Sequence, residues 1–209
     1  RKIIPAPRWL RKETLGRIKQ EQKHAEMGRR AVIIAKINSL IDSEIIEALY
    51  SASQAGVKIC LIVRGICGLK AGVKGLSENI EVRSLVGRFL EHSRIFYYYN
   101  DGREDIFLSS ADWMPRNLDR RVEILFPIED ELCRERVIEV LIYQMLDTDR
   151  ARIMQGDGSY IRFRDQTPVD ERIDSQIALM QSAIQAAAEV RQRPISFNRY
   201  EPLSAPENF

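Results

Sequence analysis

Apolar and polar positions alternate along residues 1–150 with the two periods typical of strands and helices. Residues 8–28 are polar and rich in helix-forming side chains, and Gly28 is placed as a stop signal, so a helix is expected there. Residues 31–37 form a short apolar, β-branched run, as in a buried strand. The chain therefore opens with a helix followed by a strand.

A second helix and strand follow directly. Asp42 is a good N-cap, and Gly56 marks the end of a helix whose apolar face is formed by Ile45, Ile46, Leu49 and Ala52. Residues 57–63 then form another apolar run. Residues 31–63 thus predict a strand–helix–strand unit, which implies parallel strands joined by a right-handed crossover.

The next part of the chain predicts a long loop and several shorter elements. Residues 65–75 form an irregular loop because they contain Gly65, Gly68, Gly72 and Gly75. Strands are expected at 80–86, 95–99, 105–108 and 121–127, with 95–108 forming a hairpin. Helical spacing of apolar residues predicts a helix over 130–147. This pattern predicts an α/β domain with a mixed, mostly parallel central sheet flanked by helices.

The composition changes near residue 150. Residues 155–159 have turn chemistry, and a stripe at Ile173, Ile177, Met180, Ile184 and Ala187 predicts one more helix. From Arg191 the chain is rich in Pro and Arg without periodicity, as in a flexible tail. We therefore expect a domain over 1–150 and a C-terminal helical extension over 151–209. The sequence also reads as a fragment excised from a longer protein.

Composition and charge narrow the function. The 209 residues carry 32 Lys and Arg against 30 Asp and Glu, and this near balance argues against a general nucleic-acid coat. Three cysteines without a C-x-x-C pair predict neither a disulfide framework nor a zinc site. Apolar runs reach about eight residues, well below the roughly 20 of a membrane-spanning helix. With no signal peptide at the start, a cytoplasmic location is expected, with peripheral membrane association left open.

Of the two histidines, only His92 has a setting that suggests chemistry. His24 lies in the polar helix and is best read as a solvated surface residue. His92 adjoins Glu91, is flanked by Arg88 and Arg94, and precedes an apolar strand. Imidazole serves as nucleophile or general acid, and a guanidinium holds phosphoryl oxygens. A lone histidine at a strand edge is nevertheless more often structural.

Two further features point to an anion site. Arg64 ends an apolar strand and opens the glycine-rich loop, and ligands of α/β sheets gather at the carboxyl ends of strands. Residues 109–117 bring together hydroxyls, Asp112, Arg116 and Asn117, and Asp112 could orient an imidazole. The structural alternatives stay open. The loop matches neither a Walker A nor a dinucleotide fingerprint, 109–117 could simply cap a turn, and the arginines at 116, 120 and 121 could pair with Asp119 and Glu123.

Longer motifs resemble a known family. The segments 34–42, 45–50, 63–67, 75–80, 86–95 and 109–123 are similar, in this order, to bacterial polyphosphate kinase of the first class. The resemblance covers about residues 1–165 and falls on the second C-terminal catalytic domain, which has a phospholipase D-like fold. It implies reversible transfer of the terminal phosphate of ATP to inorganic polyphosphate, with Mg²⁺ as cofactor. It also implies a homo-oligomeric intact protein whose partners are ATP or ADP, polyphosphate and its own preceding domains.

The resemblance also assigns residues. His92 and Arg64 correspond to family residues that contact the nucleotide phosphates or assist transfer. Phosphate-lining positions of that fold fall on Lys36, Asn38, Arg94, Ser110, Asp112 and Asn117. The phosphorylated histidine belongs to the preceding domain, as do the expected Mg²⁺ ligands, so no metal site is expected here. The fragment alone should have the fold and half of the site, without kinase turnover.

The chain departs from the phospholipase D pattern at two positions. Arg94 stands where H-x-K requires lysine, and Tyr99 stands in place of the pattern's aspartate. Hydrolytic chemistry is therefore less favoured. Two alternatives remain: a phospholipase D-type phosphodiesterase acting on lipid or nucleic acid, and a non-catalytic module that binds polyanions.

Overall fold

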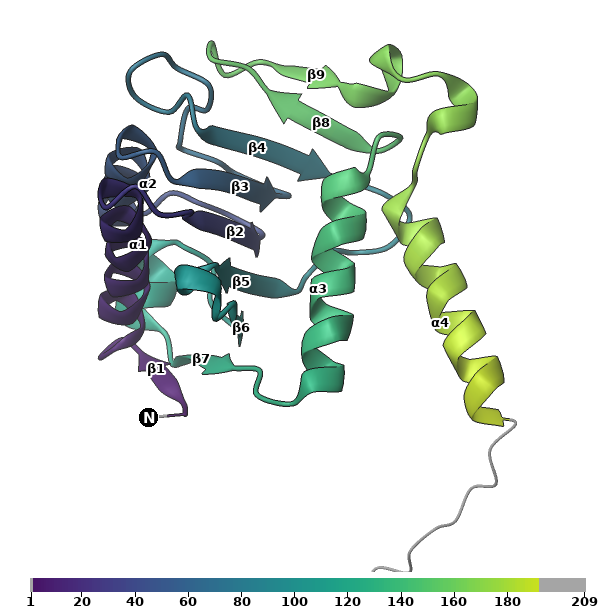
Figure 1. Cartoon of the computed structure of the whole chain (residues 1–209), viewed down its shortest axis with the longest axis horizontal. Coiled ribbons are helices and arrows are strands. Elements are labelled where there is room, and N and C mark those ends of the chain that lie inside the picture. The colour runs from purple at the N-terminus through teal and green to yellow at the C-terminus, as the bar shows by residue number, and fades with distance from the viewer. Residues whose placement is uncertain (1, 192–209) are drawn as a thin grey trace, which may run out of the picture.

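The computed structural model describes residues 2–191, in which helices cover both faces of one nine-stranded sheet (Figure 1). The helices are α1 (Leu10–Glu26), α2 (Ser43–Gln54), α3 (Glu131–Leu146) and α4 (Ser175–Arg191). The strands are β1 (Ile4–Ala6), β2 (Val32–Ile37), β3 (Lys58–Val63), β4 (Ile80–Leu85), β5 (Arg94–Tyr98), β6 (Asp105–Ser109), β7 (Glu123–Pro127), β8 (Ala151–Met154) and β9 (Tyr160–Arg162). A π-helical turn, Arg116–Arg120, lies between β6 and β7.

The predicted strand–helix–strand unit is confirmed. β2 pairs with β3 in parallel, with Val32 opposite Lys58 and Ile37 opposite Val63. The Asp42 side chain caps α2 by accepting a hydrogen bond from the Ile45 N–H at 3.2 Å. The helix predicted over 130–147 and the hairpin predicted over 95–108 are also present, as α3 and as β5 with β6.

The expectation of a mostly parallel sheet is wrong. The strand order is β1-β7-β6-β5-β2-β3-β4-β8-β9, and only β2–β3 and β3–β4 are parallel. The remaining pairs are antiparallel. A parallel pair needs a long crossover, whereas β5 to β6 and β8 to β9 are joined by short turns that reverse the chain. The sheet is thus mixed, as expected, but antiparallel pairing predominates.

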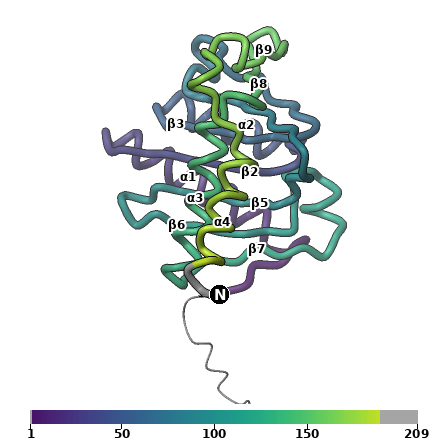
Figure 2. Tube along the Cα trace, turned by 90° about the vertical axis from the view of Figure 1, so that its right-hand side faces the viewer, coloured from purple at the N-terminus to yellow at the C-terminus, as the bar shows by residue number. Residues whose placement is uncertain are grey.

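The sheet continues past residue 150. β8 and β9, for which no strand was predicted, extend it beyond β4, and the predicted turn at 155–159 connects them. The predicted C-terminal helix is present as α4, which begins at Ser175, after Ile173, and lies against α3 (Figure 2). Ile177, Met180 and Ile184 of the predicted stripe remain exposed. Of the tail predicted from Arg191, Arg191 itself ends α4, and residues 192–209 lie outside the described residues.

Apolar side chains form one core on each face of the sheet. The larger core joins the sheet to α1 and α2 through residues such as Ile18 and Leu49, and Trp113 stacks on Phe96 with ring centroids 5.0 Å apart. The smaller core joins the other face to α3 through Leu141. Within residues 2–191, no helix is long and apolar enough to cross a bilayer.

The strand directions bring distant parts of the chain to one edge of the sheet. β2, β3 and β4 are parallel, so they end at the same edge. β5 is antiparallel to β2 and therefore begins there, and β6 returns to it. This edge receives the chain segments that follow β2, β3 and β6, together with the segment that precedes β5.

Candidate functional site

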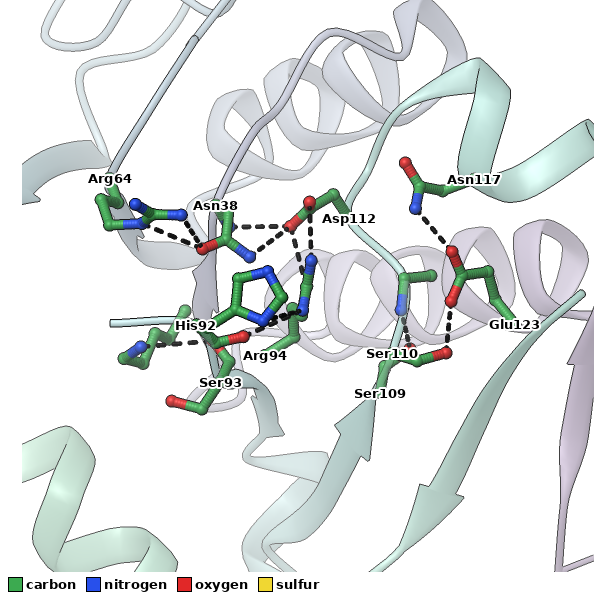
Figure 3. A network of polar contacts seen from close by, with 12 residues as sticks. Asn38, Arg64, His92, Ser93, Arg94, Ser109, Ser110, Asp112, Asn117 and Glu123 are labelled. Carbon is green, nitrogen blue, oxygen red and sulfur yellow. Dashed lines mark hydrogen bonds and ion pairs between the residues drawn. The ribbon is translucent and has the colours of Figure 1, made fainter. Parts of the chain in front are cut away.

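A chain of hydrogen bonds connects the two residues predicted to be catalytic (Figure 3). Arg64 donates from Nε and Nη2 to Asn38 Oδ1, at 3.0 and 2.9 Å. Asn38 donates from its backbone N–H and from Nδ2 to Asp112 Oδ1, at 2.8 and 3.1 Å. Arg94 binds both oxygens of Asp112 and reaches His92, with Nη1 3.3 Å from the imidazole Nδ1 and 2.9 Å from the backbone carbonyl oxygen.

The residues at the two ends of this series of hydrogen bonds, His92 and Arg64, are accessible to a ligand. The imidazole of His92 is exposed, and Arg64 is half-buried. Between them, Asn38 and Asp112 are buried. The structure therefore brings His92 and the glycine-loop arginine together through three intermediate side chains, with both ends open to solvent.

Gly65 fixes the position of Arg64. Its N–H donates to the Asn38 carbonyl oxygen at 2.7 Å, and a Cβ built on Gly65 would lie 2.8 Å from that oxygen. Only glycine permits so close an approach of two backbone segments. Gly65, the first glycine of the predicted loop, thus allows the segment after β3 to lie directly against the segment after β2.

The expected role of Asp112 needs correction. Asp112 does not hydrogen-bond to His92 and instead binds the Arg94 guanidinium in bidentate fashion. The two side chains are only 11% and 8% exposed, so their charges are poorly solvated and strongly coupled. Burial opposes ionisation of Asp112, but hydrogen bonds from Arg94 and Asn38 outweigh it and lower the pKa of the carboxyl below its usual value of 3.8. Asp112 therefore orients His92 only through Arg94.

Lys36 is part of the supporting structure. Its side chain is 3% exposed, and Nζ lies 3.2 Å from Glu91 Oε2 and 3.2 Å from the Ser93 carbonyl oxygen. Burial lowers the pKa of Lys36, against the opposing effect of Glu91. Lys36 thus fastens the residues on both sides of His92 to β2 and is not free to meet a phosphate.

Ser110 and Asn117 belong to a separate cluster. Both donate to Glu123, Asn117 from Nδ2 at 2.7 Å and Ser110 through its hydroxyl. Figure 3 shows this group beyond Asp112, on the side away from Arg64. Glu123, at the start of β7, was missed as their partner. The alternative pairing of arginines 116, 120 and 121 is not seen either, because Asp119 pairs with Arg11 and Glu123 with Ser110 and Asn117.

The ion pairs divide the predicted cations into two groups. Arg94 is neutralised by Asp112 and Lys36 by Glu91. No carboxylate pairs with Arg64 within the described part of the chain, because its hydrogen bonds go to a neutral amide. Arg64 therefore supplies the uncompensated positive charge of the site, which suits it to hold an anion.

Comparison with known proteins gives the same assignment. Residues 3–176 match the family model described as polyphosphate kinase C-terminal domain 2. The chain belongs to this family. The polyphosphate kinase of Pseudomonas aeruginosa is 52% identical over 162 residues, which cover 78% of this chain and 24% of that protein. That of Rhodopirellula baltica is 53% identical over 159 residues, 76% of this chain and 19% of that protein.

Solved structures show the same fold. The crystal structure of polyphosphate kinase from Porphyromonas gingivalis aligns with a TM-score of 0.83 and 35% identity, over 91% of this chain and 29% of that one. The phospholipase D family member NUC from Salmonella typhimurium aligns with a TM-score of 0.53 at 13% identity, over 73% of this chain and 96% of that one. The predicted phospholipase D-like fold is confirmed. The chain spans only a fifth to a quarter of the curated polyphosphate kinases cited above.

The residues of the polyphosphate kinase domain described here do not fit a Mg²⁺ site. Magnesium prefers carboxylate oxygens left free for coordination. Glu91 and Asp112, the carboxylates beside His92, already bind Lys36 and Arg94. Within residues 2–191, no group of three or more His, Cys, Asp or Glu side chains could hold a metal ion.

Two glutamines that sequence reasoning missed hold the segment before His92. Gln176, at the start of α4, accepts from the Phe89 N–H at 2.9 Å and donates to the Phe89 carbonyl oxygen at 2.9 Å and to Glu91 Oε1 at 2.8 Å. Gln144 on α3 donates to Glu91 Oε2 at 2.8 Å. A polar residue three positions after Leu141, on the buried face of α3, was the available signal for Gln144.

The Asp112–Arg94 pair predicts a pH-dependent contribution to stability. Asp112→Asn should lower the free energy of unfolding by about 3 kcal/mol at neutral pH, because it leaves Arg94 buried without its counter-charge. The folded pKa of Asp112 is depressed, so its contribution is complete above 3.8 and is lost as the pH falls through the folded pKa. Urea denaturation of both proteins should show the gap closing below pH 3.8.

Asp101→Asn is the matched control for this measurement, since Asp101 pairs with Arg29 at an exposed site where both side chains are about half exposed. This variant should cost less than about 1 kcal/mol. If the gap for Asp112→Asn is as small as that of the control, or does not change with pH, the buried pair is not a major support of the site.

The contacts of Gln176 predict a local effect on the segment that carries His92. Gln176→Ala removes the acceptor of the Phe89 N–H and a donor to Glu91. We expect exchange of the Phe89 amide hydrogen to accelerate roughly tenfold, as loss of about one hydrogen bond implies. Hydrogen exchange followed by NMR measures this directly. Gln185→Ala, an exposed glutamine on the same helix, should leave the Phe89 rate unchanged, and equal rates in the two variants would contradict the assignment.

Proposed function

We propose that this chain supplies the second half of the phosphoryl-transfer site of a polyphosphate kinase. The reaction is reversible transfer of the ATP γ-phosphate to inorganic polyphosphate. One observation supports this most. An exposed imidazole, His92, and a guanidinium without a carboxylate partner, Arg64, lie at the two ends of one series of hydrogen bonds. Membership in the polyphosphate kinase family supports polyphosphate and ATP as the proposed substrates. The cytoplasm, where ATP is abundant, is the proposed location.

Arg64 is proposed to clamp the phosphate oxygens. Asn38 occupies its Nε and one hydrogen of Nη2, so Nη1 remains free to donate. Because Asn38 fixes the plane of the guanidinium, little side-chain entropy is lost when a phosphate binds. Phosphoryl transfer depends mainly on positioning and on stabilising charge at the phosphoryl oxygens, which a fixed guanidinium provides.

His92 is proposed to act through Nε2. Arg94 has only donors, so its contact with His92 requires the imidazole Nδ1 to act as acceptor. The proton of the neutral ring then lies on Nε2. This nitrogen can donate to the leaving oxygen as the bond to phosphorus breaks, and Arg94 keeps the ring in that tautomer. The sequence suggested that the Asp112 carboxylate could orient the imidazole, whereas in the structure the Arg94 guanidinium contacts it.

The other half of the site is proposed to come from a preceding domain that carries the phosphorylated histidine. His24 is not the solvated surface residue expected from the sequence, because its side chain is only 14% exposed and its Nδ1 lies 3.9 Å from Glu21 Oε1 on α1. It is therefore not placed to take this part. The phosphodiesterase alternative is less favoured on this geometry, since the lysine of H-x-K is replaced by Arg94, whose charge is already engaged by Asp112. The likeness to NUC concerns the fold alone.

His92→Ala tests the catalytic proposal in a full-length polyphosphate kinase that contains this chain. A donor to the leaving oxygen acts mainly in the transition state, so kcat should fall by a factor of about 100 or more while nucleotide Kd changes little. Steady-state kinetics and nucleotide titration give the two quantities. Arg64→Ala should instead weaken phosphate binding and turnover together.

Two outcomes would contradict this proposal. Equal losses of kcat and affinity in His92→Ala would remove the transition-state role. Release of product from a generic phosphodiester by the 209-residue chain alone would favour the phosphodiesterase reading. The same chain with His92→Ala is the control that ties any such release to this site.

A further inference from the structure

A second cluster of cations lies at the same edge of the sheet as Arg64 and His92. A hollow of about 210 Å³ opens where β4 ends and β8 begins, and four arginines line it: Arg150, Arg152, Arg162 and Arg164. β8 and β9 form the outermost strands on this side of the sheet (Figure 1). None of these arginines takes part in the site described above.

The carboxylates around this hollow do not balance its charge. Arg150 lies 2.9 Å from Asp174 and 3.1 Å from Asp149, and Arg164 lies 3.8 Å from Asp149. Arg152 and Arg162 have no carboxylate within salt-bridge distance in the part of the chain that the structure describes. The hollow therefore has an excess of positive charge.

The strand register places the two unbalanced arginines side by side. Arg152 on β8 lies directly opposite Arg162 on β9. Like charges in this position repel and destabilise a pair of strands. An anion held between the two guanidiniums would turn this repulsion into attraction, because each could donate to it. Placing Arg152 opposite Arg162 therefore destabilises the sheet when no anion is present and favours binding of an anion.

Strand pairing and one hydrogen bond place the hollow near the proposed phosphoryl site. Ser84 on β4 lies opposite Arg152 and donates from Oγ to the Arg64 carbonyl oxygen at 3.5 Å. Two strand spacings separate β3 from β8, which is roughly 10 Å. Val86, which lines the hollow, opens the segment that leads to His92. A ligand held by Arg64 could thus extend along this edge into the hollow.

We propose that this arginine hollow binds a distal part of the polyphosphate chain whose end lies at Arg64 and His92. The proposal rests on the proposed function, since that names the substrate. Four guanidiniums around one hollow match a chain with a charge on every phosphate better than they match one phosphate group. The lining residues include no aromatic ring on which a base could stack, so a nucleotide or single-stranded nucleic acid fits less well.

The test compares the affinities of the 209-residue chain for tripolyphosphate and for a polyphosphate of several tens of phosphates. The double variant Arg152→Gln/Arg162→Gln should reduce the advantage of the long chain by on the order of tenfold, because only the long chain spans both sites. Lys19→Gln/Arg103→Gln is the matched control, with the same loss of charge at exposed positions outside the hollow. It should leave the long-to-short affinity ratio unchanged.

Each other outcome is decisive. Equal ratios in the double variant and in the control would overturn the proposal, as would equal displacement of long polyphosphate by single-stranded DNA of the same charge. Arg64→Ala separates the two proposals. If it leaves tripolyphosphate binding intact while the double variant still weakens the long chain, the arginine hollow stands and the proposed phosphoryl site fails. Circular dichroism melting checks that every variant is folded.

Discussion

The Asp112 carboxylate is the interaction on which the site depends. It accepts four hydrogen bonds, two from Asn38 and two from Arg94. These partners follow β2 and open β5, while Asp112 itself follows β6, so one buried charge ties three separate segments together at the edge of the sheet. Without it, Arg94 would be a largely buried cation with no counter-charge, and the ring of His92 would lose its fixed neighbour. The cost of burying Asp112 is offset because almost every lone pair has a partner.

The hydrogen bonds of the site also explain why only one of its three cations, Arg64, is available to a ligand. Lys36 is buried and Arg94 is largely buried, each is paired with a carboxylate, and both act as structural supports. Arg64 is held instead by a neutral amide, which sets its direction and leaves its charge free. An arginine anchored by an amide is both oriented and electrostatically available, a combination that a salt bridge would not give. The choice of Asn38 rather than a carboxylate at this position therefore matters for binding an anion.

Much of the secondary structure could be predicted from the sequence, because capping residues and the spacing of apolar residues determine it. The cap at Asp42 and the parallel crossover between β2 and β3 follow from residue types and periodicity. The mostly antiparallel sheet could not be inferred in the same way, since strand order depends on packing between distant segments. For the site, His92 and Arg64 were singled out from their positions in the sequence and from motif resemblance, but the hydrogen bonds that connect them were not predicted. The sequence suggested that Asp112 could orient an imidazole, yet its carboxylate binds the nearby Arg94 guanidinium, which is the stronger partner for a buried carboxylate.

The region beyond residue 150, which was predicted to be a C-terminal extension, contributes Gln176 to the support of the site. Gly87 lies so close to Gln176 that a Cβ there would be 2.5 Å from the glutamine oxygen, so the segment before His92 is packed directly on the start of α4. Ser175, the preceding residue, is held by Asp147 at the end of α3, with a 2.8 Å bond from its N–H. The position of His92 is thus set from two directions: through Arg94 and Asp112 from the sheet, and through Gln176 from α4. The second of these supports comes from a residue beyond 150, so the segment that carries His92 is packed against the C-terminal part of the chain as well as against the sheet.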